Sequence, residues 1–458
     1  MARQATDGTP IDHDAPCIAI LGTCDTKLDE LLYVRTHLIE THHVRVKLID
    51  VGRTPSTHPA IDITQLSLLS VSASQSTHTH LPPLRPFDVA QLPRAQLINV
   101  LAERAGPIIA ELAAWHDLHG FVALGGSGGS ALAAAVMRRL PLGFPKLLVS
   151  TMAAGDVSPL VGEADVALLY SVVDIAGLND ILCPILENAS GAIAGMARAY
   201  HARLNREQEA VAESGRRDGR NRRKRIAITM FGVTTPAVTR ARELLEQYDC
   251  TPYVFHATGA GGRAMEQLVT QGFFDGVLDL TTTELADELV GGVLSAGPHR
   301  LEAAAKAGVP QVVSLGALDM VNFGPRASVP ERFVSAGRTL YEHNASVMLM
   351  RTTRQECAEL GRTIARKLRE AGARREATEV WVPRGGVSAL DREGEAFWDP
   401  DADAALVEAL REELQGEKDE ERRIKVVERP EDINDPAFVE GTVQSLAHMM
   451  QLRPAGGS

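Results

Sequence analysis

The feature that most constrains the fold is an alternation, repeated along most of the chain, of short runs of Val, Ile and Leu with longer Ala-, Leu- and Glu-rich stretches. Short apolar runs are typical of strands buried on both faces, and the longer stretches supply the crossover helices that parallel strands need. At 458 residues the chain is too long for one ordinary core. The sequence therefore predicts an α/β protein of two Rossmann-like subdomains, each a mostly parallel sheet covered by helices.

Changes in composition along the chain predict where these domains begin and end. Residues 65–93 are rich in Ser, Thr, His and Pro and lack a sustained apolar period, so we expect a mobile insertion there. The predicted segments are a disordered tail (1–16), a first α/β domain (17–205), a basic linker (206–225), a second α/β domain (226–415) and a C-terminal docking tail (416–458).

Charge and cysteine content exclude several classes of partner. The chain carries 47 Lys and Arg against 59 Asp and Glu, and the resulting net charge of −12 repels nucleic acids and anionic membranes. Five scattered cysteines without a C-x-x-C pair favour a reducing compartment, and we expect no metal site. With neither a signal-like N-terminus nor a long apolar stretch, the sequence predicts a cytoplasmic protein.

Two strands of the first domain are followed by candidate phosphate-binding loops, GTCDTK (22–27) and the glycine-rich GGSGGS (125–130). The second loop has four glycines in six residues, which is costly in backbone entropy unless a phosphate must approach successive N–H groups closely. For the first loop the alternative is a capped structural turn, in which Asp25 or Thr26 satisfies the first turn of the helix. The expected phosphate contacts are Gly22, Thr23, Asp25, Thr26 and Lys27 in the first loop, and Gly125, Gly126, Ser127, Gly128, Gly129 and Ser130 in the second.

A dinucleotide is a weaker candidate for this site. Gly126, Gly128 and Ala131 satisfy G-x-G-x-x-A, but the next strand ends at Ser150 and Thr151 instead of at the acid that binds an NAD ribose. Asp174, at another probable strand end, could orient a ribose or Mg²⁺, or could cap a loop.

The second domain has its own polar residues at probable strand ends. If these ends converge, His256, Glu284 and His343 are candidate catalytic acid–base groups, although a single His is more often a packing or capping residue. The candidate substrate contacts are Thr229, Thr234, Gly261, Gly262, Thr282 and Asp319.

Several long motifs resemble the family of the tomato mosaic virus resistance protein. They include GTCDTK, GGSGGSALAAAVMRRLPLGFPKLLVSTMAAGD, YSVVDIAGLN, TMFGVTTPAV, FHATGAGGRAMEQL and GALDMVNFG, in order over roughly residues 17–440. The resemblance implies two α/β subdomains, ATP on the first and a homodimer. It adds Ser150, Thr151, Met152 and Arg53 to the expected nucleotide contacts. Where the family usually has an Arg-Gly pair this chain reads PRAQ at 93–96, which leaves Arg94 open as a phosphate ligand.

Two hypotheses of function follow. The first is an ATP-dependent enzyme, with Mg²⁺ left open, that acts on a small metabolite held by the second domain. The second is a nucleotide-gated module that binds a protein partner without appreciable turnover. The enzyme predicts ATP use stimulated by a metabolite, whereas the module predicts a change of shape on nucleotide binding.

Overall fold

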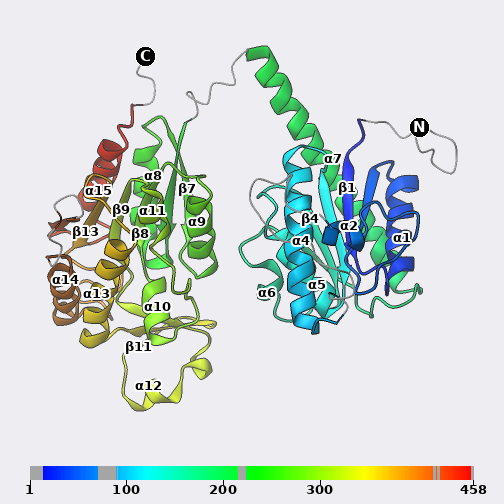
Figure 1. The fold of residues 1–458 in the computed structure, drawn as a ribbon. Helices are drawn as coiled ribbons and strands as arrows, with labels where there is room; N and C mark the ends of the chain where they lie inside the picture. The colour runs from blue at the N-terminus through cyan, green and yellow to red at the C-terminus, as the bar shows by residue number, and fades with distance from the viewer. Residues whose placement is uncertain are drawn as a thin grey trace. The chain divides into compact units, whose positions relative to one another are not determined.

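The computed structural model describes residues 14–70, 89, 91–214, 223–415, 419 and 423–454. The chain divides into two compact units, Met1–Arg217 and Asp218–Ser458. Each unit, called a lobe below, contains a parallel sheet covered by helices (Figure 1), which confirms the predicted fold class. No helix in the described part of the chain is long and apolar enough to cross a membrane.

The first lobe has a five-stranded sheet of order β2-β1-β3-β4-β5 in which every pair is parallel. Its strands are β1 (Cys17–Gly22), β2 (Arg45–Asp50), β3 (Gly120–Gly125), β4 (Lys146–Ser150) and β5 (Ala167–Tyr170). Its helices are α1 (Leu28–Thr36), η1 (His37–Thr41), α2 (Gln65–Ser70), α4 (Arg94–Ala114), α5 (Ser127–Met137), α6 (Ser158–Val161) and α7 (Leu182–Ser214).

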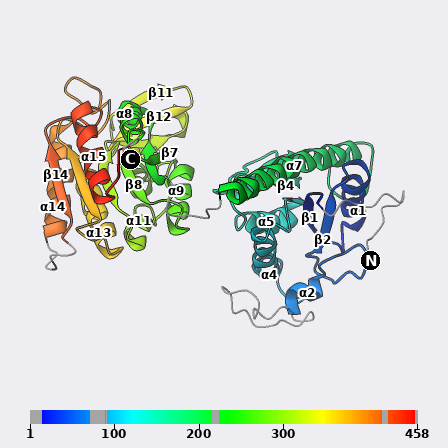
Figure 2. The same ribbon diagram turned by 90° about the horizontal axis from the view of Figure 1, so that it is seen from above.

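Alternation along the strands of the first lobe builds a core on each face of its sheet. In β1, Ile18 and Ile20 pack with α1 and α7, whereas Ala19 and Leu21 pack with α4 and α5. The two helix layers are seen on opposite sides of the sheet in Figure 2. Burial on both faces explains why these strands read as continuous apolar runs.

The strand order places a crevice at the carboxyl edge of the first sheet. From β1 the chain moves to β2 on one side, and β3 then lies on the other side of β1. Crossovers that leave in opposite directions create a topological switch point, where α/β proteins bind ligands beyond the strand ends. The loops after β1 and β3 are the two glycine-rich loops identified in the sequence.

The second lobe has a six-stranded parallel sheet of order β14-β13-β9-β8-β6-β7 and a small antiparallel sheet of order β10-β12-β11. The strands are β6 (Lys224–Met230), β7 (Cys250–His256), β8 (Gly276–Thr281), β9 (Gln311–Gly316), β10 (Met320–Phe323), β11 (Leu340–Asn344), β12 (Val347–Arg351), β13 (Thr378–Pro383) and β14 (Lys425–Arg429). The helices are η3 (Gly232–Thr234), α8 (Thr235–Leu245), α9 (Ala260–Thr270), α10 (Glu284–Val290), α11 (Ala303–Ala307), η4 (Arg326–Ser328), α12 (Glu331–Ser335), α13 (Arg354–Glu370), α14 (Pro400–Gln415) and α15 (Pro436–Met449).

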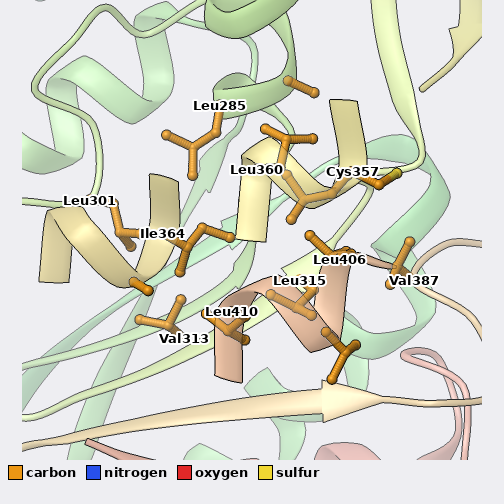
Figure 3. Packing of buried hydrophobic residues seen from close by; sticks show 14 of the residues in the cluster. Leu285, Leu301, Val313, Leu315, Cys357, Leu360, Ile364, Val387, Leu406 and Leu410 are labelled. Atoms are coloured by element: carbon orange, nitrogen blue, oxygen red, sulfur yellow. The ribbon is translucent and has the colours of Figure 1, made fainter. Parts of the chain in front are cut away.

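The largest core of the second lobe lies between this parallel sheet and the helices α13 and α14. Figure 3 shows Leu360 and Ile364 of α13 beside Leu406 of α14, with Val313 and Leu315 of β9 beneath them. On the opposite face, α8 and α15 cover β6 and β8.

Three segment boundaries differ from the sequence prediction. The helix α7 continues to Ser214, through the first half of the expected linker, and residues 215–222 lie outside the described residues. Within the expected insertion, residues 65–70 form α2, whereas 71–88 and 90 lie outside the described residues, as do 1–13 of the expected tail. The expected docking tail instead contains β14, which pairs with β13, and α15, because both bury apolar residues in the second lobe.

Candidate functional site

The carboxyl edge of the first sheet holds a pocket of about 580 Å³, which we call the edge pocket. Loops after four strands meet there. The lining residues are Thr23, Thr26, Lys27, Arg94, Gly126, Ser127, Gly128, Gly129, Thr151, Met152, Val172, Val173 and Asp174. Ten of these residues were expected from the sequence to contact a nucleotide.

The N-terminus of α5 opens into the edge pocket. Its first three residues, Ser127, Gly128 and Gly129, line the pocket, and their amides donate no hydrogen bond within the described part of the chain. The first amides of a helix lack intrahelical acceptors and carry its positive dipole end, so they attract an anion. A Cβ on Gly126 would lie 3.9 Å from the Thr151 hydroxyl, so this glycine keeps space open toward the pocket.

Two of the expected contact glycines serve packing instead. A Cβ on Gly22 would lie 2.5 Å from a methyl group of Leu31, and a Cβ on Gly125 would lie 2.6 Å from the amide nitrogen of Ser130. Both are buried and neither lines the edge pocket. They bring each strand end close to the helix that follows.

Ser130 and Ser150 are also buried beneath the edge pocket, where they position its loops. Their hydroxyl groups lie 2.6 Å apart, and Ser130 Oγ donates to the carbonyl oxygen of Gly125 at 3.0 Å. Ser150 Oγ accepts from the amide of Met152 at 2.9 Å. These bonds join the loop after β3 to the loop after β4.

The acid Asp25 organises the loop after β2. Its Oδ2 accepts from the amides of Arg53 and Thr54 at 2.9 and 3.0 Å. Asp50, at the end of β2, accepts from the amides of Cys24 and Gly52 at 3.0 and 2.8 Å. The sequence analysis missed Asp50, although an acid that directly ends a buried strand is a readable signal.

Lys27 and Asp174 line the edge pocket from two different loops, those after β1 and β5. The Lys27 ammonium donates to the carbonyl oxygen of Ile175, which ties the loop after β1 to the segment that contains Asp174. Val172, in the same segment, is 58% exposed and has φ of 62°, a strained conformation for a β-branched residue. Such strain is found preferentially at functional sites.

A second hollow, which we call the α4–α5 cleft, adjoins the edge pocket and measures about 310 Å³. Both spaces are lined by Arg94, at the start of α4, whose Nη2 lies 3.4 Å from Ser127 Oγ. The cleft is lined by Thr23, Asp25, Thr26, Val51, Arg53, Arg94, Leu97, Ile98, Leu101, Gly128, Gly129 and Leu132. Arg53 therefore lies at the cleft, where its Nη1 donates to the carbonyl oxygen of Leu92.

The acidic residues of the described part of the chain do not form a metal cage. No group of three or more His, Cys, Asp or Glu in those residues is placed to hold a metal ion. Asp174 is the carboxylate residue in the lining of the edge pocket. It could meet Mg²⁺ that arrives bound to phosphates.

In the second lobe, the Glu284 carboxylate is held by hydrogen bonds inside the fold. It is fully buried, and its Oε1 accepts from the amides of Gly259 and Gly262 at 2.7 and 3.1 Å. Its Oε2 accepts from Arg300 Nε at 2.6 Å. Burial raises the pKa of the Glu284 carboxyl, and the nearby Arg300 charge opposes that shift. These internal contacts account for Glu284 without a catalytic role.

The partner of Glu284, Arg300, is the centre of a buried ion network that the sequence did not reveal. Arg300 donates to both Asp279 oxygens at 2.6 Å, and its Nη1 lies 3.3 Å from Glu266 Oε1. The four residues lie between positions 266 and 300 on different structural elements, and their spacing matches no motif that the sequence analysis used.

The glycines near Glu284 follow from close packing. A Cβ on Gly262 would overlap the Glu284 carboxylate, and a Cβ on Gly261 would overlap the backbone of His256. The expected role of both glycines in substrate binding has no support in these contacts.

The remaining expected substrate contacts are also buried. Thr229 donates to Asp279, Thr234 bonds to Thr281, and Thr282 donates to the carbonyl oxygen of Ser314. Asp319 accepts from Ser388 at 2.8 Å, and burial raises its pKa to about 6.

The two candidate catalytic histidines lie on different sheets. His256 ends β7 at an exposed position beside Phe231, with ring centroids 6.0 Å apart. His343 is exposed on β11 of the antiparallel sheet. The three predicted residues therefore lie on three different elements, β7, α10 and β11, and β11 belongs to another sheet than β7.

Comparisons with known proteins agree with this two-lobed architecture. The chain is 41% identical to a UPF0261 protein of Clostridium tetani over 95% of this chain and 99% of that protein. It is 36% identical to the ToMV susceptible protein tm-1(GCR26) of Solanum lycopersicum over 95% of this chain, but spans only 56% of that protein. A solved UDP-N-acetylglucosamine 2-epimerase from Rickettsia bellii aligns over 66% of this chain and 79% of its own, at 12% identity, but its TM-score of 0.20 supports no inference.

Family profiles match both lobes. The profile described as Uncharacterised protein family (UPF0261) N-terminal domain matches residues 16–202, and the corresponding C-terminal domain profile matches residues 223–450. The chain therefore belongs to the UPF0261 family, which confirms the resemblance to the tomato proteins.

Proposed function

We propose that the first lobe binds ATP, with the phosphates at the N-terminus of α5 in the edge pocket. The observation that carries this proposal is the set of unpaired amides at Ser127, Gly128 and Gly129, which face a pocket of about 580 Å³ at the switch point of the sheet. Lys27 and Arg94 would supply positive charge from the pocket walls, and Asp174 would contact Mg²⁺ held by the phosphates.

Within this proposal, the protein is an ATP-dependent enzyme that acts on a small metabolite. The support is the location of the pocket at the sheet edge, where α/β enzymes place their reacting groups. Glu284 is not proposed as a catalytic acid or base, because its carboxylate is already bonded to the amide of Gly259 and to Arg300. His256 and His343, which are both exposed, are the acid–base candidates of the second lobe that remain accessible to a substrate.

A nucleotide-gated binding module is the second candidate, and one observation favours it. Met152 and Val172, which line the edge pocket, are exposed by 48% and 58%, and Leu178 and Ile181 in the segment that follows Val172 are exposed by 42% and 52%. Exposed apolar patches beside a polar rim are typical of protein interaction surfaces. A partner docked there would sense whether the pocket is filled.

Calorimetric titration of Mg-ATP into the purified protein tests the binding proposal. The Gly128→Asp variant places a carboxylate where the phosphates would lie, next to the flexible end of Arg94. We expect saturable binding by the native chain and its loss in this variant. The control is Gly195→Asp, which introduces the same charge at an exposed position of α7 with open space around it and should bind normally. Native protein that fails to bind Mg-ATP would refute the proposal.

A second experiment distinguishes the enzyme from the binding module. Release of ADP, measured by a coupled assay with and without a panel of small metabolites, is expected for the enzyme. The module instead predicts no turnover, together with a change in small-angle scattering when ATP is added.

A further inference from the structure

The α4–α5 cleft is more apolar than the edge pocket. Its walls include Leu97, Ile98 and Leu101 from α4, Leu132 from α5 and Val51 after β2. Folding tends to close such spaces, because apolar side chains are stabilised by packing against one another. This cleft of about 310 Å³ remains open and falls at the lower end of the volumes that small ligands occupy.

The cleft and the edge pocket adjoin each other. Five residues line both spaces: Thr23, Thr26, Arg94, Gly128 and Gly129. A ligand whose anionic end lies at the glycines can therefore extend into the apolar cleft without crossing a wall. Such a ligand needs one charged end and one apolar part.

Polar side chains at the cleft indicate a ring with polar edges. Asp25 and Arg53 line the cleft together with the apolar walls. The flat faces of a nucleobase suit Leu and Ile side chains, and its edge atoms suit a carboxylate or a guanidinium. Arg94 lies where the two spaces meet, and a planar guanidinium can both pair with a phosphate and stack on a ring.

We infer that the α4–α5 cleft is the subsite for the base of the nucleotide whose phosphates lie in the edge pocket. The inference rests on the proposed function and adds the part of the ligand that provides selectivity. It makes Ile98, a half-buried residue of α4, a determinant of selectivity. Inorganic tripolyphosphate, which has no base, would occupy the edge pocket alone.

The test compares Mg-ATP with Mg-tripolyphosphate by calorimetry on the full chain. We expect ATP to bind native protein about tenfold more tightly or better, because the base buries apolar surface in the cleft. Ile98→Trp fills the cleft with an uncharged side chain and should abolish this advantage while leaving tripolyphosphate affinity within about twofold. The matched control is Asn99→Trp, at the next and exposed position of α4, which should keep the advantage.

The outcomes separate the two proposals. If neither compound binds native protein, the proposed function fails. If both bind and Ile98→Trp keeps the full advantage of ATP, the base lies elsewhere and the subsite is refuted. Circular dichroism of Ile98→Trp checks its fold. Should that variant unfold, Ile98→Ser removes apolar contact without adding bulk, and the inference then requires a severalfold loss of ATP affinity with tripolyphosphate unchanged.

Discussion

Glu284 Oε1 accepts a hydrogen bond from the amide of Gly259 at 2.7 Å, so the glycine-rich start of α9 already holds an anion that belongs to the protein. The same carboxylate oxygen also accepts a hydrogen bond from the amide of Gly262. In the first lobe, by contrast, the amides that begin α5 face a pocket. Two similar sequence signals therefore have different meanings. One helix start is filled by an internal carboxylate, and the other is open to a ligand.

Removal of the Glu284 carboxylate should destabilise the second lobe. In Glu284→Ala, two amides lose their acceptor, and the buried Arg300 loses one of its carboxylate partners while it keeps Asp279, Glu266 and the carbonyl oxygen of Thr281. Breaking a buried ion pair from one side costs about 3–5 kcal/mol. Urea unfolding followed by tryptophan fluorescence measures the loss, because Trp381 and Trp398 both lie in this lobe.

The matched control for Glu284→Ala is Glu288→Ala, an exposed position on the same helix, α10. It should change the free energy of unfolding by no more than about 0.5 kcal/mol. Equal urea midpoints for the two variants would show that the ion network does not stabilise the fold.

Asp287 should make the stability of the second lobe depend on pH. Burial raises the pKa of its carboxyl from 3.8 to about 7, although Asn322 and the amide of Leu294 donate hydrogen bonds to it. The folded state therefore holds a proton that the unfolded state has released. The contribution of Asp287 to the free energy of unfolding is therefore greatest below about pH 4. It is lost as the pH rises toward 7, and the loss is on the order of 4 kcal/mol at most.

The variant Asp287→Asn tests this pH dependence. An amide keeps the shape and cannot ionise, so the part of the slope between pH 4 and 7 that comes from Asp287 should disappear from urea unfolding data. Asp401→Asn, at an exposed position of α14, should retain the native slope. A native protein that gains stability over this range, with the gain unchanged in Asp287→Asn, would contradict the assignment.

How far the sequence could predict the site depended on the range of the interactions. The strand–glycine–helix patterns around Gly22 and Gly128 are local, and strand order alone brings their loops to one edge. The pattern around Gly261 is equally local, but its meaning depends on Glu284, more than twenty residues further along the chain. No periodicity reveals which side chain will reach a helix start.

Contacts between distant segments also limited the prediction of the C-terminal segment. We expected a docking tail after residue 415, and in the structure this segment contains the edge strand β14 and the helix α15, which packs on the second lobe. Pairing of β14 with β13 is a contact between distant segments, and a five-residue strand carries too short a pattern to predict it.

Ser150 should affect nucleotide binding without contacting the nucleotide. In Ser150→Ala, the amide of Met152 loses its hydrogen-bond acceptor. The Ser130 hydroxyl loses its contact with the Ser150 hydroxyl and keeps its hydrogen bond to the carbonyl oxygen of Gly125. A lost buried hydrogen bond costs about 1 kcal/mol of stability. We expect the loop after β4 to shift and ATP affinity to fall severalfold, as measured by calorimetry.

A cysteine distinguishes positioning by Ser150 from simple loss of stability. Ser150→Cys keeps a weak acceptor of similar size, so it should recover part of the affinity that Ser150→Ala loses. Ser158→Ala, at an exposed position of the same lobe, should bind ATP normally. Unchanged affinity in Ser150→Ala would mean that the loop after β4 does not shape the pocket.

Lys27 should contribute to phosphate affinity through its charge. Its ammonium lines the edge pocket and donates to the carbonyl oxygen of Ile175, so Lys27→Met removes both a cation and a link between two loops. A charge-assisted contact of this kind is worth about a factor of ten in affinity. Lys27→Arg keeps the charge and should lose less, whereas Lys306→Met, exposed in the second lobe, should lose nothing. Because Lys27 acts on phosphates, calorimetry should show similar losses for Mg-ATP and Mg-tripolyphosphate; a loss confined to ATP would place Lys27 at the nucleoside instead.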